Sequence, residues 1–501
     1  MKKTAFIFVL VSMLSACTKD ITKLNIDPKN PVNVPSYSLF TEAERSITNT
    51  VTSASVNLNI FRLIEQQWTE TTYLNETNYQ ITYRKQPDAI WSAIYSGALT
   101  NFDRAKKLIP TDVKDAGTQK NEIAIADIME VYSYYYLVTT FGNIPYSQAL
   151  DISQPFPKYD DAATIYSELL TRLDGDIAAL NPSAGSYGNA DIIYGGIPAN
   201  WAKFANTLKL KMGITIADVD NVKAKAVVEA AVKAGVFTSN DDNALFAYVT
   251  TPPNTNPVWV DLVQSQRHDF VGTSQFINLL NPNTATQDPR TPYFFAENKN
   301  SVYLGADNGS GSGGIVYSNY SLPSGPLLTP GPPTSSQPKS IGSVTNPDFP
   351  GLLLDYSETE FNLAEAVERG FNVGGTIESH YDAAITASIT YWGGTTAQAS
   401  AYLLLPKVAF ATATGTTPLQ KIALQEYLAL YNRGWDAWIV NRRLDYPALV
   451  APPNAYSAFP VRFTYPISEQ NVNVVNYNQA SAAIGGDKVT TKLFFDTKGA
   501  Y

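Results

Sequence analysis

Helical spacing of apolar residues constrains the fold of this chain more than any other feature of its sequence. In residues 121–141, Ile125, Met129 and Tyr132 recur at intervals of three or four, and Gly142 follows as a helix stop. The same kind of spacing is found in residues 160–180, 199–219, 222–234, 358–369, 376–392 and 419–441. The sequence therefore predicts a mainly α fold.

Residues 246–354 differ from these helical segments because they carry few charges and little periodicity, and eight prolines fall within Ser321–Pro350. Long segments without periodicity are typically functional loops. Short turns between the helices favour tetratricopeptide-like helical hairpins, although no regular repeat period is visible. We expect one domain over residues 36–496, with a tetratricopeptide-like helical-hairpin scaffold at 36–245 and 355–445, a loop-rich, irregular ligand-binding lobe at 246–354, and extended C-terminal segments at 446–496.

The N-terminus combines a short apolar stretch with the single cysteine of the chain. Two lysines precede ten largely apolar residues, which are too few to span a bilayer because a spanning helix needs about 20. Leu14-Ser15-Ala16-Cys17 follows at once and resembles a bacterial lipobox. We predict a signal peptide over residues 1–16, lipidation of Cys17 and a proline-containing, non-helical tether over 17–35. The alternative is an ordinary secretory signal with a chance cysteine.

Composition and motifs argue against several classes of function. The net charge is −9 and no Lys/Arg run is present, so nucleic acid is not an expected partner. Two histidines and one cysteine exclude Cys/His metal clusters, and we expect neither a metal nor a cofactor. Gly309–Gly314 satisfies G-x-G-x-x-G without the flanking strand and helix that phosphate binding needs. His268 and His380 lie in polar surroundings that favour ordinary hydrogen-bonded side chains, so we expect no enzyme.

Aromatic and amide side chains are the remaining candidates for ligand binding, because the chain has 30 Tyr, 22 Phe and 7 Trp but only 16% charged residues. Sugars are held by stacking on aromatic rings and by hydrogen bonds from amides, carboxylates and arginines. Loop positions of this kind give the predicted ligand-binding set: Tyr73, Asn75, Tyr79, Trp259, Arg267, Tyr303, Tyr317 and Tyr320. The alternative is that these rings pack the loops onto the helices. Core positions are expected instead for the tryptophans in helical patterns, which are Trp68, Trp91, Trp201 and Trp392.

Five further patterns follow Cys17 along the chain in a fixed order: Trp201–Lys211, Asp288-Pro289-Arg290, Glu360–Ala366, Tyr381–Gly393 and Arg462–Pro466. Together with the lipobox they resemble the SusD/RagB family of outer-membrane nutrient-binding lipoproteins of Bacteroidetes. The resemblance runs from residue 17 to about residue 496, which is nearly the whole chain.

Some of these patterns predict packing and no site. Glu360 and Glu365 flank an apolar helix, where a buried carboxylate needs a partner such as Arg443 or Arg462. The segment Leu493–Asp496 stands where family members often carry Trp-Trp-Asp. We interpret its two phenyl rings as packing residues.

The resemblance implies a helical scaffold with a loop-rich ligand face, placed over a SusC-type TonB-dependent barrel transporter. We therefore expect a lipoprotein anchored in the outer membrane and facing the exterior. It would bind oligosaccharides by aromatic stacking and deliver them to the transporter, without catalysis. Three alternatives remain open: the same role for peptides or another non-glycan nutrient, a lipid-anchored glycoside hydrolase, and a purely structural lipoprotein.

Overall fold

The computed structural model describes residues 34–310, 315–324 and 343–499. The predicted signal peptide, Cys17 and nearly all of the tether lie outside these residues, as does part of the Gly309–Gly314 motif. Within the described ranges, no helix is long and apolar enough to cross a membrane.

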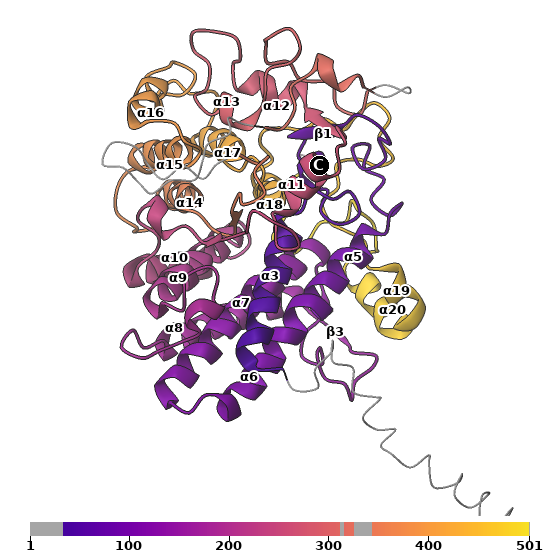
Figure 1. The fold of residues 1–501 in the computed structure, drawn as a ribbon, viewed down its shortest axis with the longest axis vertical. Coiled ribbons are helices and arrows are strands. Elements are labelled where there is room, and N and C mark those ends of the chain that lie inside the picture. Colours follow the sequence, from indigo (N-terminus) through magenta and orange to yellow (C-terminus); the bar gives the residue numbers. More distant parts are fainter. Residues whose placement is uncertain (1–33, 311–314, 325–342, 500–501) are drawn as a thin grey trace, which may run out of the picture.

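Helices of the first half pack side by side, each against the next (Figure 1). The series consists of α3 (Ser36–Thr52), α6 (Thr100–Asp112), α7 (Ala116–Phe141), α8 (Ala162–Ala179), α9 (Pro198–Thr215) and α10 (Asn221–Ala234). Between α3 and α6 lie the shorter α4 (Phe61–Ile64), α5 (Gln86–Ser92) and the π-helical η1 (Ala93–Leu99). This stacking of neighbouring helices confirms the mainly α, hairpin-based fold that the sequence predicts.

Helices of the second half continue the scaffold through α14, which contacts α9, α15 and α17. The elements are α14 (Tyr356–Glu368), α15 (Ile377–Tyr391), α16 (Thr396–Leu403), α17 (Pro418–Ala429) and α18 (Gly434–Leu444). Two scaffold segments that are far apart in the sequence are thus joined by the contact of α9 with α14.

Side-chain caps explain why several helices begin where they do. The carboxylate of Asp115 accepts a hydrogen bond from the N–H of Thr118 at 2.7 Å, so α7 begins five residues before the segment predicted from periodicity. Thr376 and Ser379 form a reciprocal capping box at the start of α15. At the other end of α7, Gly142 adopts φ +85° and ends the helix, as the sequence predicts.

The single helix predicted over residues 419–441 is wrong, because the chain breaks into α17 and α18. Asn432 lies in the left-handed region at φ +67°, and Gly434 then begins α18. A Cβ on Gly434 would lie 2.4 Å from the backbone nitrogen of Arg62. The break therefore lets α18 pack closely against α4, a contact that local periodicity does not reveal.

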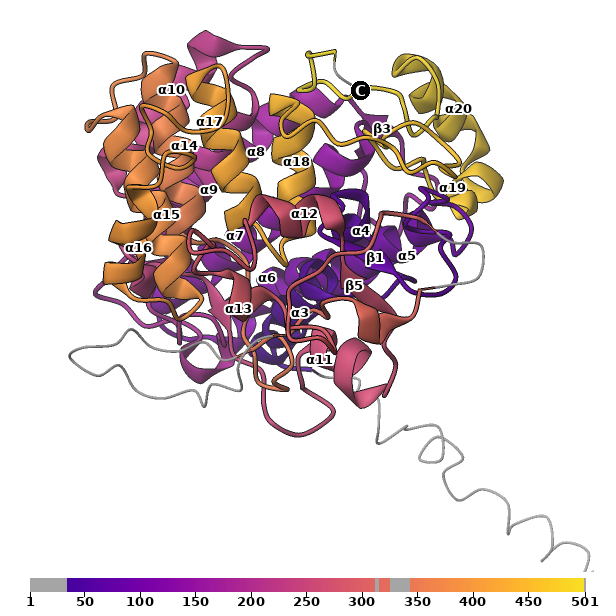
Figure 2. The same ribbon diagram turned by 90° about the horizontal axis from the view of Figure 1, so that it is seen from above.

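The extended C-terminal segments predicted over residues 446–496 are also wrong in part, because this region contains α19 (Ile467–Val472) and α20 (Val474–Ala483). Residues 459–466 have an alternating pattern that favours a strand, but no strand forms there. Instead, the N–H of Phe463 donates to the carbonyl of Thr140 at 3.0 Å, and buried Arg462 contacts Asp487 at 2.7 Å. The bond to Thr140 holds the segment against the end of α7. Figure 2 shows α19 and α20 beside β3, across the molecule from α14–α16.

The described residues contain three short antiparallel strand pairs. They are β1 (Trp68–Glu70) with β5 (Phe270–Gly272), β2 (Ile144–Pro145) with β3 (Tyr159–Asp160), and β4 (Leu245–Phe246) with β6 (Gly351–Leu352). The β4–β6 pair brings the two ends of the lobe together, and β1–β5 ties the lobe to the N-terminal half. The remaining short elements are η2 (Gly188–Ala190), η3 (Asn240–Asp242), α11 (Pro257–Trp259), η4 (Val260–Gln264), α12 (Ser274–Leu279), α13 (Thr291–Phe294) and η5 (Tyr317–Asn319).

The core contains most of the aromatic residues that the sequence places there. Trp68, Trp201 and Trp392 are buried, and half-buried Trp91 packs against the same core. Phe495 is also buried, with the guanidinium carbon of Arg442 4.9 Å from its ring centroid. Phe495, one of the two phenyl rings in the C-terminal segment, is therefore a packing residue, as predicted.

Several buried charges of the scaffold are paired. Glu365 binds Arg443 at 2.8 Å, which confirms one of the two predicted partners. Arg462, the other predicted partner, pairs with Asp487, while Glu360 lies 2.6 Å from Nδ1 of His380.

Candidate functional site

A pocket of about 400 Å³ opens where the lobe meets the N-terminal half. We call it the proximal pocket. Three segments form its wall: the turn after α3, the loop after β1, and the stretch from η4 to β5. Its lining residues are Ala54, Ser55, Val56, Asn57, Glu70, Thr72, Tyr73, Tyr83, Arg84, Asp261, Ser265, Arg267, Asp269 and Phe270. The antiparallel register sets Glu70 opposite Phe270 and so brings the last two segments together.

Two tyrosine rings of this wall are highly exposed. The exposed fraction is 68% for Tyr73 and 61% for Tyr83. Tyr73 adopts φ +58° in the loop after β1, a backbone conformation that is uncommon for a residue with a side chain. The guanidinium carbon of Arg84 lies 5.7 Å from the ring centroid of Tyr83. These rings offer flat apolar faces next to a cation.

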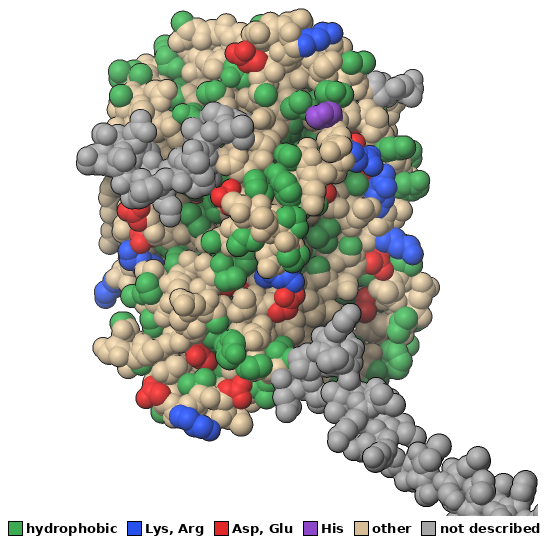
Figure 3. Space-filling view, viewed as in Figure 1, with side chains coloured by type: hydrophobic (Ala, Val, Ile, Leu, Met, Phe, Trp, Pro, Cys, Tyr) green, Lys and Arg blue, Asp and Glu red, His purple; other side chains and the backbone are tan. Residues whose placement is uncertain are grey.

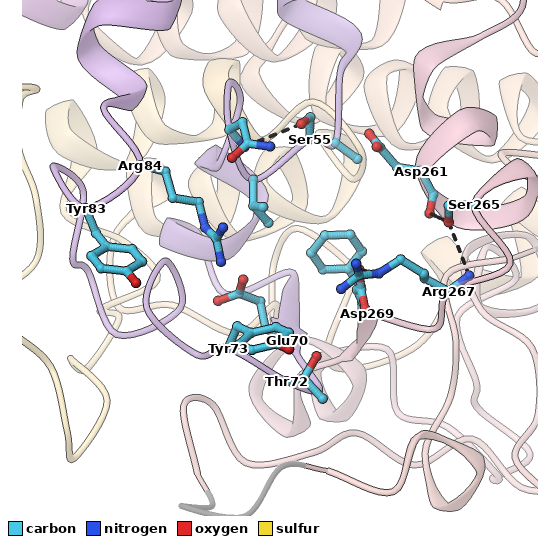
Figure 4. Close-up of a pocket in the computed structure, with 14 residues that line it drawn as sticks. Ser55, Glu70, Thr72, Tyr73, Tyr83, Arg84, Asp261, Ser265, Arg267 and Asp269 are labelled. Atoms are coloured by element: carbon cyan, nitrogen blue, oxygen red, sulfur yellow. Dashed lines mark hydrogen bonds and ion pairs between the residues drawn. The ribbon is translucent and has the colours of Figure 1, made fainter.

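Each arginine of the pocket is fixed by one carboxylate. Nε of Arg84 lies 2.9 Å from Glu76, and Nε of Arg267 lies 2.6 Å from Asp269. Figure 4 shows the two guanidinium groups entering the pocket from opposite sides. The hydrogen bond and charge of Asp269 raise the pKa of Arg267, so this side chain stays cationic at neutral pH. Because it is 56% exposed, its other N–H groups can donate to a ligand.

Two acidic residues of the wall have raised pKa values. Burial raises the pKa of Glu70 to about 9, and the nearby charge of Glu76 adds to the effect. Burial likewise raises the pKa of Asp261 to about 6; Asp269 adds to this shift and Arg62 opposes it. At neutral pH Glu70 is therefore protonated and Asp261 is ionised. With cations and anions nearly balanced, the pocket suits an uncharged polar ligand better than a highly charged one.

Of the predicted ligand-binding residues, Tyr73 and Arg267 line this pocket. Asn75 is half-buried in the same loop, where its side chain donates to Gln80. Tyr79 corrects the prediction because it is only 2% exposed and its hydroxyl accepts a hydrogen bond from Gln66 at 2.8 Å. Its positive φ of 64° accompanies a turn that places the ring in the core, where it cannot stack on a ligand.

The predicted rings of the lobe are not brought together with Tyr73. Trp259 and Tyr320 are half-buried, and half-buried Tyr303 packs against the core. None of these three lines the proximal pocket. Tyr317 is 41% exposed and lies 4.2 Å from His268, measured between ring centroids.

Sequence reasoning missed several residues of the wall. Tyr83 and Arg84 carried a usable signal, since a ring and a cation follow each other in the Tyr/Asn-rich loop. Asp269 stands two residues after Arg267 and could have been found as its partner. Glu70 and Asp261 carried no such signal, because only the β1–β5 pairing brings their segments together.

The surface over the lobe shows scattered charged side chains with hydrophobic and uncharged atoms between them (Figure 3). In the part of the chain that the structure describes, no group of three or more His, Cys, Asp or Glu side chains converges as metal ligands would.

Residues 28–466 match the SusD-like family model, which is described as starch-binding and associating with the outer membrane. The match spans most of the sequence. The chain belongs to the SusD-like family. No curated protein matches it.

Solved structures share this fold of SusD-like proteins. A chitin-binding protein is similar with a TM-score of 0.77 and 24% identity, covering 92% of this chain and 100% of that one. A chitin-binding SusD homolog from Flavobacterium johnsoniae is similar with a TM-score of 0.74 and 21% identity, covering 92% of this chain and 100% of that one. A SusD homolog from Bacteroides fragilis is similar with a TM-score of 0.75 and 22% identity, covering 93% of this chain and 100% of that one. At these sequence identities, the similarity shows that the folds are alike.

Proposed function

We propose that this SusD-like protein is an outer-membrane lipoprotein that binds an oligosaccharide nutrient in the proximal pocket and delivers it to a SusC-type TonB-dependent transporter. One observation carries the binding proposal. Two highly exposed tyrosine rings stand beside two arginines, each of which is fixed by a carboxylate. The protein acts by binding and not by catalysis.

The chemistry of a sugar fits this wall. The C–H face of a pyranose ring packs on Tyr73 or Tyr83, while its hydroxyls reach Arg267, Arg84 and Asp261. Each stacked ring contributes roughly 1–2 kcal/mol when its area leaves water. Support also comes from the family description, which names starch, and from similar structures described as chitin-binding.

Lipidation of Cys17 and the partner transporter follow from the lipobox and from the family. The anchor would hold the protein at the outer membrane, with the predicted tether leading to the domain that begins near residue 36. The same arrangement would place the domain on the exterior face, over the barrel. A pull-down in mild detergent from the native outer membrane tests this part: a TonB-dependent barrel should come down in near-equal amount, and its absence would contradict the delivery role.

Titration of the full-length protein in detergent with maltooligosaccharides and chitooligosaccharides tests the binding part. At least one series should bind, and Tyr73→Ala should weaken that binding about tenfold through loss of one stacked ring. The melting temperature should not change, because this ring is mostly exposed.

Tyr37→Ala is the matched control. Tyr37 is also an exposed tyrosine, at 54%, but it stands at the start of α3, whose other end leads into the pocket. A helix of 17 residues is about 25 Å long, so this substitution should leave binding unchanged. If short peptides bind and both glycan series do not, the ligand class proposed here is wrong.

A further inference from the structure

A second pocket of about 270 Å³ adjoins the proximal pocket, and we call it the distal pocket. Arg267 and Phe270 line both pockets, so the two cavities lie on either side of this pair. The other residues of the distal pocket are Leu262, Val263, Gln266, His268, Ala296, Leu322, Pro323, Ser324 and Thr345.

The residues between the two pockets are held firmly. Phe270 begins β5, where it pairs with Glu70 of β1. The N–H of Arg267 donates to Oγ of Ser265 at 3.2 Å, and that hydroxyl donates in turn to the carbonyl of Asp261 at 2.7 Å. With its Nε also fixed on Asp269, Arg267 forms a ridge between the two cavities, and its guanidinium points into the proximal pocket (Figure 4).

The two pockets offer different chemistry. The proximal wall has exposed tyrosines, arginines and acids, whereas the distal wall is lined by aliphatic side chains such as Leu262, Val263 and Leu322. At the rim of the distal pocket, His268 lies against Tyr317 with 4.2 Å between the ring centroids and 30° between the planes. Tyr317 is 41% exposed, and His268 is exposed as well. They form a second flat surface on the far side of Arg267 from Tyr73.

Neither pocket alone encloses a long ligand. Ligand pockets generally hold about 300–1,000 Å³, and the two volumes here fall near or below the lower end of that range. A ligand that crossed the Arg267 ridge would use both cavities and both flat surfaces at once. A chain of linked sugar units is a molecule of this shape, with rings for each surface and hydroxyls for the arginine between them.

We propose that the His268–Tyr317 pair and the distal pocket form a second subsite, so that the protein selects linear oligosaccharides long enough to cross the Arg267 ridge over shorter ones. This rests on the proposed function of glycan binding. The proximal pocket binds one end of the chain, and the distal subsite adds affinity only when the chain reaches it. Discrimination by length therefore resides in residues that do not touch short ligands.

A length series tests the proposal. Full-length protein in detergent is titrated calorimetrically with the glycan series that it binds, from two to six units. For the wild type, affinity should rise with length and then level off. Tyr317→Ala should weaken binding of the longest members about three- to tenfold, which is the effect of one stacked ring, and leave the shortest unchanged. Tyr73→Ala should weaken all lengths by a similar factor.

His268→Ala is a second variant that removes the other ring of the pair. The backbone carbonyl of His268 accepts the hydrogen bond from Thr71, so that contact survives the substitution. This variant should show the same dependence on length as Tyr317→Ala. Equal losses at every length, no loss at any length, or a wild-type affinity that does not rise with length would each overturn the second subsite. Failure of every glycan to bind the wild type would instead overturn the proposed function itself.

Discussion

Charged side chains form one cluster buried in the scaffold and another open to solvent in the proximal pocket. In the scaffold, Arg433 contacts Glu358 at 2.7 Å and Asp436 at 2.8 Å, and all three side chains are at most 7% exposed. In the pocket, Arg267 contacts only Asp269 among the ion pairs found in the described residues, and its side chain is 56% exposed. Arginines of the two clusters therefore differ in how much of their hydrogen-bonding capacity the protein itself uses.

Burial decides what each cluster does. Lys211 of α9 also reaches Glu358 of α14 at 2.7 Å, so the buried cluster joins helices from both halves of the scaffold. Charges removed from water must be paired, and loss of one partner leaves the others buried without a counter-charge. In the pocket, water can replace a lost partner, and equally a ligand can replace water. The same residue types thus fix the fold in one place and remain available to a ligand in the other.

Arg433→Leu should have the largest effect on stability. It leaves Asp355, Glu358 and Asp436 with too few cations, and we expect the free energy of unfolding to fall by about 3–5 kcal/mol. Urea denaturation followed by circular dichroism measures the change. Arg267→Leu is the matched substitution in the pocket and should cost less than about 1 kcal/mol, because its ion pair is exposed. Equal losses for the two variants would show that burial does not separate the clusters.

A smaller effect is expected from Glu65→Gln, which tests a buried carboxyl without a cation in contact. Burial raises the pKa of Glu65 to about 8, with Asn441 and Arg442 opposing the shift. The folded chain then keeps a proton that the unfolded chain loses above about pH 4.3. Stability should therefore fall as pH rises from 5 to 8, by up to about 1.4 kcal/mol per pH unit for this group.

Glu65→Gln should flatten that dependence without abolishing it, because Glu70 also has a raised pKa, of about 9. Urea midpoints measured from pH 5 to pH 8 give the slope. Glu42→Gln is the control, since this carboxylate is 49% exposed and paired at the surface with Arg45. If stability fell as steeply with pH in Glu65→Gln as in the wild type, the pH dependence would come from a group other than Glu65.

The helices could be predicted largely from the sequence because their signals are local. Periodicity found α7, and Gly142 marked its end, but the break between α17 and α18 could not be found in this way. That break depends on the close approach of Gly434 to Arg62, which lies far away in the sequence. The same limit applies near the C-terminus, before α19 and α20. The alternating pattern at 459–466 favours a strand, but the buried contact of Arg462 with Asp487 decides the path of the chain there.

The candidate site was predictable only in part, for a related reason. Residue type and loop position were enough to find Tyr73 and Arg267. They were not enough to separate Tyr73 from Tyr79, because the alternation of rings and amides does not show which ring a turn directs into the core. Asp261 was missed because its place in the wall depends on strand pairing between distant segments.

The smallest expected effect concerns Asp261, through which pH should act on binding. Burial raises its pKa to about 6, with a further contribution from Asp269, so lowering the pH from 7.5 to 5 protonates the carboxylate. An ionised carboxylate accepts stronger hydrogen bonds from sugar hydroxyls than a neutral one, by roughly 1 kcal/mol. We expect affinity for an uncharged glycan to fall about two- to fivefold over this range.

Asp261→Asn should remove this pH dependence, as measured by calorimetric titration at both pH values. Glu122→Gln is the control, since burial also raises the pKa of Glu122, to about 7, but this residue lies in α7 and does not line the pocket. Both groups change charge over the same pH range, and only one of them faces the ligand. If Glu122→Gln flattened the binding profile and Asp261→Asn did not, pH would act on binding through the scaffold, and the separation of the two clusters would fail.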